Sequence, residues 1–369
     1  MSKPIQEQPG LRFIEPYVPG TPIEDVEREL GVHDVVKLAS NENPVGTSPA
    51  AANAAQAALS RLNRYPDGQS SQLRHALADY LGLSPGQIIV GNGVDGLIVQ
   101  TCLAFLDRDC DVIVSRSSFP IYDIYTHVMR ASLVKTPLKN YGLDLGAMAS
   151  AICERTKIIF VCNPNNPTGT IVTQNEVEMF MANVPDHVLV VFDEAYYEFV
   201  AARDYPQTLE YVRQGRKNVM VLRTFSKIYG LAGIRLGYGI AAPETLAPLN
   251  KVKEPFAVNL LAQAAGSAAL ADERFLNDTL TANEKGRSYL YQQFDRLGVR
   301  YVESHTNFVL VELGPGAAEM QQRLLKRGLI VRPCAMYELP DCLRITVGEE
   351  SQNKRLIEAL EEELEGLRH

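Results

Sequence analysis

The 369-residue sequence lacks an excess of positive charge and a long apolar run near its start. Its formal net charge is −8, which disfavours a nucleic-acid backbone or an anionic membrane as the main partner, because both attract basic surfaces. Residues 1–20 contain four prolines and no apolar stretch, so we expect neither a secretory signal nor a membrane-spanning helix. We therefore expect a cytoplasmic protein that binds neither nucleic acid nor membrane.

Paired cysteines are also missing. The six cysteines form no C-x-x-C motif and do not cluster with histidine at the spacing of metal ligands, so we expect reduced thiols and no metal site. What the sequence does contain is the composition of an ordinary soluble globular protein, with 46% hydrophobic and 22% charged residues. Its length suits two domains or one large α/β unit.

Short apolar runs alternate with helical stretches between about residues 85 and 240. Each run is rich in β-branched residues and is bounded by Gly, Pro, Asn or Asp, as is typical of strands buried on both faces. The alternation predicts a largely parallel sheet covered by helices on both sides. The five runs are residues 88–90, 112–114, 158–161, 188–192 and 219–222.

After Pro255 the sequence changes to long helical stretches followed by two further strand candidates, residues 308–311 and 343–347. This change indicates a second, smaller α+β domain. We expect three regions. They are an N-terminal arm with part of the small domain (1–45), a large domain (46–252) and the small C-terminal domain (253–369).

Polar segments follow four of the five runs of the large domain. They are Gly91–Gly96, Asn163–Gly169, Asp193–Tyr196 and Thr224–Lys227. In sheets of this kind, ligands bind at the loops beyond the carboxyl ends of the strands. We therefore expect a single site along one edge of the sheet.

Lys227 is the central residue of this site. A lysine just past an apolar strand is partly buried, and desolvation together with a nearby cation would lower its pKa and free its amine as a nucleophile, as Schiff-base chemistry requires. The alternative is a lysine that ends a strand and extends its amine into water. The polar residues around Lys227 favour the catalytic role.

The residues around Lys227 suit the binding of a phosphate monoester. Thr224, Ser226 and Arg235 supply two hydroxyls and a guanidinium, and the glycines between residues 230 and 237 let the backbone approach an anion closely. The turn Gly91–Gly96 precedes an apolar helical run and would present backbone N–H groups to the same anion. Alone, that turn is equally compatible with a simple connection between strand and helix.

Asp193 follows five apolar residues, and a carboxylate at the end of a buried strand needs a cationic partner to stay ionised. A pyridinium nitrogen is such a partner, and the ring would then act as an electron sink. Tyr196 and Asn166 could donate hydrogen bonds to a phenolic oxygen on the same ring. Alternatively, Asp193 caps a helix and Tyr196 packs as an interface aromatic.

Together these residues resemble the fold-type I pyridoxal-phosphate aminotransferases of the aspartate aminotransferase superfamily, and within it the histidinol-phosphate aminotransferase family most closely. The resemblance implies a large domain with a mostly parallel seven-stranded sheet between helices, plus a smaller α+β domain. The segment from Ser226 to Arg235 is its most specific part. The matching motifs, in the order of the family, are Asn41–Pro44, Arg64–Asp67, Asn163–Gly169, Asp193–Tyr196, Thr224–Gly237, Arg332–Pro333 and Leu343–Gly348.

The resemblance also implies the cofactor, pyridoxal 5′-phosphate, and residues that hold it. Lys227 would carry it as a Schiff base and move a proton between the substrate's Cα and C4′ of the cofactor. Asp193 would pair with the pyridinium nitrogen, and Phe119 would stack on the ring. Two residues, Asn166 and Tyr196, would hold the phenolic oxygen. The phosphate would be bound by the backbone of Gly93, Val94 and Asp95 and by Thr224, Ser226 and Arg235.

The substrate and subunit contacts follow from the same resemblance. Arg344 would bind the substrate's carboxylate, which suits a bidentate guanidinium, although a strand arginine can instead pair with a surface acid. Arg332 would be a second anion contact, and Tyr17 and Asn166 would contact the substrate. Tyr65 would reach the phosphate of the neighbouring subunit, so the active enzyme is expected to be a homodimer.

The reaction implied is a ping-pong transfer of the amino group between L-histidinol phosphate and the glutamate/2-oxoglutarate pair, a step of histidine biosynthesis. An aminotransferase for phenylalanine or tyrosine would share the cofactor residues and differ in pocket lining. A decarboxylase or lyase would break another bond of the same amine. An inactive regulatory relative is disfavoured, since no basic helix-turn-helix segment precedes Asn41 and both Lys227 and Asp193 are present.

Overall fold

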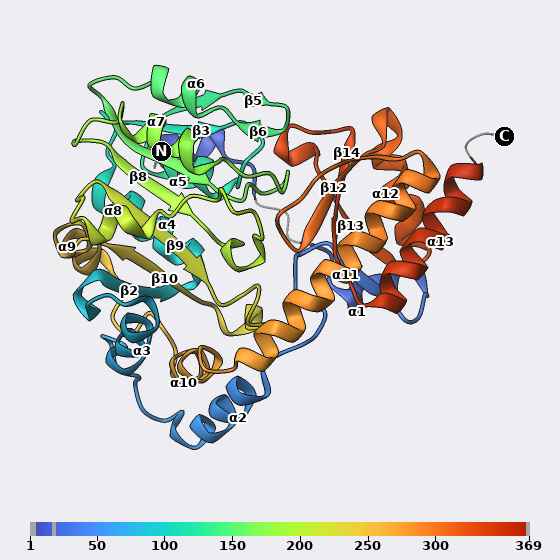
Figure 1. The fold of residues 1–369 in the computed structure, drawn as a ribbon, viewed down its shortest axis with the longest axis horizontal. Coiled ribbons are helices and arrows are strands. Elements are labelled where there is room, and N and C mark those ends of the chain that lie inside the picture. Colours follow the sequence, from blue (N-terminus) through green and yellow to red (C-terminus); the bar gives the residue numbers. More distant parts are fainter. Residues whose placement is uncertain (1–4, 17–19, 367–369) are drawn as a thin grey trace.

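The computed structural model describes residues 5–16 and 20–366, which form two layered parts around two separate sheets (Figure 1). Tyr17, expected in the substrate pocket, lies outside the described residues. Among the helices that the structure describes, none combines the length and apolar character needed to cross a bilayer.

The larger part is built on a seven-stranded sheet with the order β2-β10-β9-β8-β7-β3-β4. β10 runs antiparallel to both of its neighbours, and the pairs β9/β8, β8/β7, β7/β3 and β3/β4 are parallel. The five predicted strands are therefore confirmed. The strands are β2 (Ile88–Asn92), β3 (Asp111–Ser115), β4 (Ser132–Thr136), β7 (Thr156–Cys162), β8 (Leu189–Asp193), β9 (Val219–Thr224) and β10 (Leu236–Ala241).

Helices cover both faces of this sheet, and successive residues of a strand point into two different hydrophobic cores. In β8, Val190 and Phe192 belong to one core, whereas Leu189 and Val191 belong to the other. The first core is covered by α3 (Ser71–Leu81), α6 (Leu145–Ser150), α7 (Gln174–Met181), α8 (Leu209–Arg213) and α10 (Leu260–Ala269). The second is covered by α4 (Gly93–Phe105), α5 (Ile121–Val128) and α9 (Pro243–Val252).

The smaller part contains a five-stranded sheet in the order β1-β13-β14-β12-β11. Its long helix α11 begins at an N-cap, Asp272, and ends at Gly298 in the left-handed conformation. The strands are β1 (Val36–Leu38), β11 (Arg300–Val302), β12 (Phe308–Glu312), β13 (Leu329–Pro333) and β14 (Cys342–Thr346). The helices are α1 (Ile23–Leu30), α11 (Glu273–Leu297), α12 (Ala317–Lys326) and α13 (Glu350–Gly366).

Shorter elements complete the described chain. The helix α2 (Pro49–Ala58) packs against α10, and β5 (Leu138–Lys139) and β6 (Gly142–Leu143) form a hairpin. The 3-10 turns are η1 (Pro9–Phe13), η2 (Leu59–Arg61), η3 (Pro85–Gln87), η4 (Tyr197–Phe199), η5 (Ala232–Ile234), η6 (Gly314–Gly316) and η7 (Ala335–Tyr337).

The N-terminal residues divide between the two parts. Gln8 Nε2 donates to Val128 O at 3.1 Å, so η1 packs on α5 of the large part. β1, by contrast, pairs in parallel with β13. The domain limits at residues 45 and 252 stay a prediction, and the packing of α10 on α2 and α3 favours a later second limit, near Asp272.

Candidate active site

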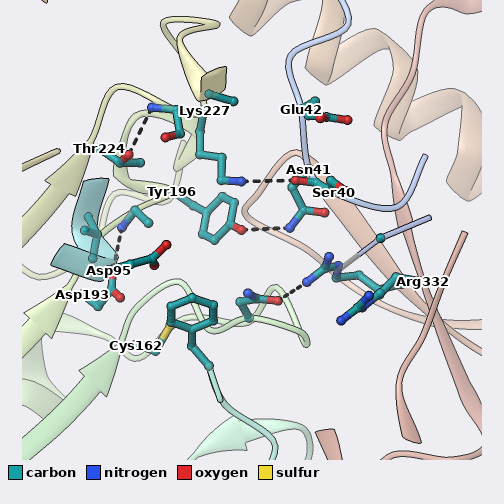
Figure 2. A pocket seen from close by; sticks show the side chains of 18 of the residues that line it. Ser40, Asn41, Glu42, Asp95, Cys162, Asp193, Tyr196, Thr224, Lys227 and Arg332 are labelled. Carbon is teal, nitrogen blue, oxygen red and sulfur yellow. Dashed lines mark hydrogen bonds between the residues drawn. The ribbon is translucent and has the colours of Figure 1, made fainter. Parts of the chain in front are cut away.

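A cavity of about 280 Å³ lies between the carboxyl edge of the seven-stranded sheet and the small sheet (Figure 2). Polar segments after β7, β8 and β9 and the start of α4 all contribute to it, as the sequence predicted. The expected site residues that line it are Val94, Asp95, Phe119, Asn166, Asp193, Tyr196, Thr224, Ser226, Lys227, Arg235, Arg332 and Arg344.

Lys227 projects its amine into this cavity. Its Nζ donates to the backbone oxygen of Ser40 at 3.3 Å and lies 5.7 Å from the ring centroid of Tyr196. Burial, and next the positive charge of Arg344, lower the pKa of the Lys227 amine to about 8. The unprotonated share of this amine near neutral pH is therefore much larger than that of an ordinary lysine, as a nucleophile requires.

Asp193 ends β8 with its carboxylate buried at the base of the cavity. Tyr122 donates its hydroxyl proton to Oδ2 at 2.6 Å, and the N–H of Ala195 donates to Oδ1 at 3.2 Å. Burial raises the pKa of the Asp193 carboxyl to about 6. A cation on the cavity side would stabilise the ionised form. Tyr122 was missed as a site residue, because no local signal in the sequence links it to a residue 71 positions away.

The start of α4 and Arg235 meet at one corner of the cavity, which we call the anion-binding corner because the phosphate is expected there. The Nη2 atom of Arg235 donates to Asp95 Oδ2 at 3.0 Å, and its Nη1 donates to Ser226 Oγ at 3.4 Å. The N–H of Gly93 donates to Arg235 O in this structure, and the expected phosphate contacts of the Gly93, Val94 and Asp95 backbone stay a prediction. Gly93 also provides space, since a Cβ there would lie 2.7 Å from Arg235 Nη2.

The hydroxyl of Thr224 forms its hydrogen bonds within the protein in this structure. Its hydroxyl donates to Leu236 O at 3.3 Å and accepts the N–H of Ser226 at 3.1 Å. Because its single proton is used within the protein, Thr224 in this structure shapes the loop that carries Lys227. A direct contact from Thr224 to a phosphate stays a prediction.

Asn166 and Tyr196 face the cavity from two different loops, as predicted. Arg344 Nη1 donates to Asn166 Oδ1, which leaves the amide nitrogen of Asn166 as its donor toward a ligand. The hydroxyl oxygen of Tyr196 accepts a hydrogen bond from Asn41 Nδ2 at 2.8 Å. Asn41 was missed as a site residue and entered the sequence analysis only as part of a motif.

The two predicted arginines stand side by side on the small sheet. Arg332 of β13 and Arg344 of β14 are register partners, and both are buried. Arg344 is held by the protein, with Nη2 donating to Ala39 O at 2.8 Å and Nη1 to the hydroxyl of Tyr337 at 3.3 Å. Two buried guanidinium groups at one end of a cavity suit anionic groups of a ligand.

Tyr65 lies away from this cavity within a single chain. Its side chain is 82% exposed and stacks on Phe256 with ring centroids 4.6 Å apart. It lines a separate depression beside α10. Its expected contact with a neighbouring subunit therefore stays a prediction.

Comparison with known proteins places this geometry among aminotransferases. The model of the family described as aminotransferase class I and II matches residues 33–360. A histidinol-phosphate aminotransferase from Moorella thermoacetica is 49% identical over 98% of this chain and 94% of its own. One from Symbiobacterium thermophilum is 46% identical, covering 95% and 96%. The crystal structure of histidinol-phosphate aminotransferase from Sinorhizobium meliloti, in complex with pyridoxal-5′-phosphate, is 28% identical with a TM-score of 0.91, covering 99% of both chains.

Proposed function

The chain belongs to the class I and II aminotransferases, within the histidinol-phosphate aminotransferase family, and on this premise we propose that it converts L-histidinol phosphate and 2-oxoglutarate into imidazole acetol phosphate and L-glutamate. The observation that carries the proposal is the pairing of Arg332 and Arg344 in one cavity with the amine of Lys227. Transfer of an amino group requires the amine of Lys227, and binding of the anionic groups of both substrates requires the two arginines.

Pyridoxal 5′-phosphate fits the residues of the site. The buried Asp193 carboxylate, whose pKa burial raises to about 6, would gain from a cationic ring nitrogen. Arg235 and the first N–H groups of α4 would hold the phosphate, and Lys227 would hold the aldehyde carbon. When bound, the cofactor supplies an electron sink for the electron pair released as the Cα–H bond of the amine breaks.

The chain's own residues then move the proton and hold the reactants. Lys227 Nζ would take the proton from the substrate's Cα and deliver it to C4′ of the cofactor, because its lowered pKa of about 8 suits both directions near neutral pH. Asn166 and Tyr196 would orient the ring by donating to its oxygen. Tyr122 keeps the Asp193 carboxylate aimed into the cavity through its 2.6 Å hydrogen bond.

The two substrates bring different anionic groups to one pocket. Histidinol phosphate carries a phosphate and no carboxylate, whereas glutamate carries two carboxylates. Arg344 is held by Ala39 O, Asn166 and Tyr337, so its guanidinium is fixed in place beside the cavity where an anion would bind. Arg332 beside it extends the same positive surface. One pair of arginines therefore serves both halves of a ping-pong reaction.

The enzyme is proposed to act as a cytoplasmic homodimer in which Tyr65 reaches the phosphate of the neighbouring subunit. An exposed tyrosine stacked on Phe256 has the apolar area and the free hydroxyl for such a contact. Sedimentation would then give a mass of twice 40.8 kDa. A monomeric mass would overturn this part of the proposal.

The decisive experiment follows the cofactor absorbance in single turnovers with histidinol phosphate, glutamate and phenylalanine. Fast conversion by the first two and slow conversion by phenylalanine supports the proposal. Fast conversion by phenylalanine with slow conversion by histidinol phosphate would identify an aromatic amino acid aminotransferase.

The Lys227→Ala variant should lose turnover by several orders of magnitude while keeping its fold, and near-normal turnover would exclude the mechanism.

A further inference from the structure

Asn41 connects the large part of the molecule to the small sheet at the edge of the cavity (Figure 2). Its side chain is 1% exposed, and its backbone adopts a left-handed conformation with φ of 55°. Asparagine tolerates this conformation better than most residues. The amide nitrogen of Asn41 donates to the hydroxyl oxygen of Tyr196 at 2.8 Å.

Hydrogen bonds from the small sheet determine which way the Asn41 amide points. The N–H of Asn41 donates to Thr346 Oγ1 at 2.9 Å, and the Thr346 hydroxyl donates to Asn41 Oδ1 at 3.1 Å. Because Oδ1 accepts that proton, Nδ2 is the atom that faces Tyr196. Asn307 Nδ2 also donates to the backbone oxygen of Asn41 at 3.0 Å. The donor at Tyr196 is thus set by residues of β14 and of the segment before β12.

This arrangement limits where the Tyr196 hydroxyl proton can point. Burial raises the pKa of the Tyr196 hydroxyl well above its ordinary value, so the group stays protonated. A hydroxyl has one proton, and the Asn41 amide donates to the oxygen from one side, so the proton turns away from Asn41. The ring itself is held edge-on against Phe308, with centroids 5.2 Å apart.

We propose that Asn41 is a positioning residue that keeps the Tyr196 hydroxyl oriented as a hydrogen-bond donor into the cavity, toward the ring oxygen of the cofactor. This inference rests on the proposed function, because it needs a ligand oxygen there. Arg344 and Thr346 are two residues apart in β14, so their side chains lie on the same face of this strand. The strand that carries the anion-binding arginine also holds the residue that directs Tyr196.

The test is a pH titration of the visible absorbance of the protein loaded with pyridoxal 5′-phosphate, in Asn41→Asp and Asn41→Gly variants. Both residues tolerate the left-handed backbone. A carboxylate at position 41 would accept the Tyr196 proton and turn it away from the cavity, whereas glycine only removes the donor. A donor to the negatively charged ring oxygen favours the deprotonated chromophore, so its loss should raise the titration midpoint, by about one pH unit for Asn41→Asp.

A double-mutant cycle with Tyr196→Phe separates this effect from the charge of the new carboxylate. Without the hydroxyl, Asn41→Gly should shift the midpoint no further, and Asn41→Asp should add only its electrostatic part. Equal shifts with and without the Tyr196 hydroxyl would overturn the positioning role of Asn41.

The matched control is Asn218→Asp, at a buried asparagine whose amide donates to Pro185 O at 3.2 Å and Val188 O at 3.1 Å, at the other end of β9. It should lower the melting temperature and leave the titration midpoint unchanged. If the unsubstituted protein shows no Lys227-dependent visible band, the proposed function itself fails. A normal band with equal shifts in both backgrounds overturns only the role of Asn41.

Discussion

Burial sets the chemistry of the two central ionisable residues, in opposite directions. Desolvation lowers the pKa of Lys227 to about 8 and raises that of Asp193 to about 6. Each shift disfavours the charged form. The site thus holds a reactive amine and a carboxylate that gains from a cationic partner.

The pH dependence of cofactor loading should follow the Lys227 amine. Only the unprotonated amine attacks an aldehyde, so the rate at which the cofactor-free protein binds pyridoxal 5′-phosphate should rise with pH up to about 8 and then level off. Stopped-flow absorbance between pH 6 and 10 measures this rate. A rate that continues to rise through about pH 10, the range of an ordinary lysine, would contradict the lowered pKa.

Arg344→Lys should raise the KM for glutamate by about tenfold to a hundredfold, because an ammonium cannot form the paired hydrogen bonds of a guanidinium with a carboxylate. Steady-state kinetics with varied glutamate measures the change, and thermal unfolding checks the fold. The control is Arg300→Lys on β11. Arg300 is exposed, and its guanidinium pairs with the Glu312 carboxylate at 2.6 Å. An unchanged KM in Arg344→Lys would remove Arg344 from the substrate site.

At the scale of elements, the start of α4 and the strand β10 approach each other unusually closely. A Cβ at Gly237 would lie 2.7 Å from both the carbonyl carbon of Gly93 and the nitrogen of Val94. Glycine at this position of β10 therefore lets the first turn of α4 sit beside Arg235. The anion-binding corner depends on this contact between two backbones.

Gly237→Ala should push α4 away from β10 and weaken cofactor binding by about tenfold, since overpacking of this kind costs about 1–3 kcal/mol. Gly96→Ala in α4 is the matched control, because a Cβ at Gly96 would meet only Asn92 Cβ, at 3.4 Å. It should instead stabilise the helix by up to about 1 kcal/mol. Equilibrium cofactor binding and melting temperatures distinguish the two. Unchanged cofactor affinity in Gly237→Ala would contradict this prediction, because the anion-binding corner would then accommodate the added methyl group.

At the scale of the whole molecule, the buried ion pair of Arg223 and Glu194 and the partly exposed Glu198 lie in the large part, outside the residues that line the cavity. Arg223 pairs with Glu194 at 2.9 Å, and its guanidinium lies 3.5 Å from the ring centroid of Tyr197. Among the described residues, Glu198 Oε2 has no hydrogen-bond partner. Burial raises the pKa of the Glu198 carboxyl to about 7, although Arg223 opposes the shift.

Glu198 should therefore make stability fall as the pH rises. Between about pH 4.5 and 7 the folded protein holds a proton on Glu198 that the unfolded chain has released, so the free energy of unfolding decreases by up to about 3 kcal/mol across this window. Glu198→Gln should flatten that decline, as urea unfolding of the cofactor-free protein at pH 5 and 8 would measure. The control Glu244→Gln, at an exposed residue paired with Lys217, should leave the decline in place. An equal decline in Glu198→Gln would contradict the assignment.

Local patterns in the sequence predicted much of the large sheet and its functional edge. The strands β2, β3, β7, β8 and β9 were recognised because each is a continuous apolar run. Two strands of the same sheet were missed. β10 carries Gly237 and Gly239, which resemble a loop, and β4 at the sheet edge has only two apolar residues, Leu133 and Val134, between polar ones. In β10, glycine is required by the backbone and side chains packed against it.

The sequence by itself determined the residue types at the strand ends, including Lys227 and Asp193, because apolar runs and the polar residues that follow them are adjacent along the chain. Only the tertiary structure decided which distant residues meet these groups. Tyr122 reaches Asp193 across 71 positions, and Asn41 reaches Tyr196 across 155. Such contacts depend on how helices and sheets pack, which no local periodicity encodes.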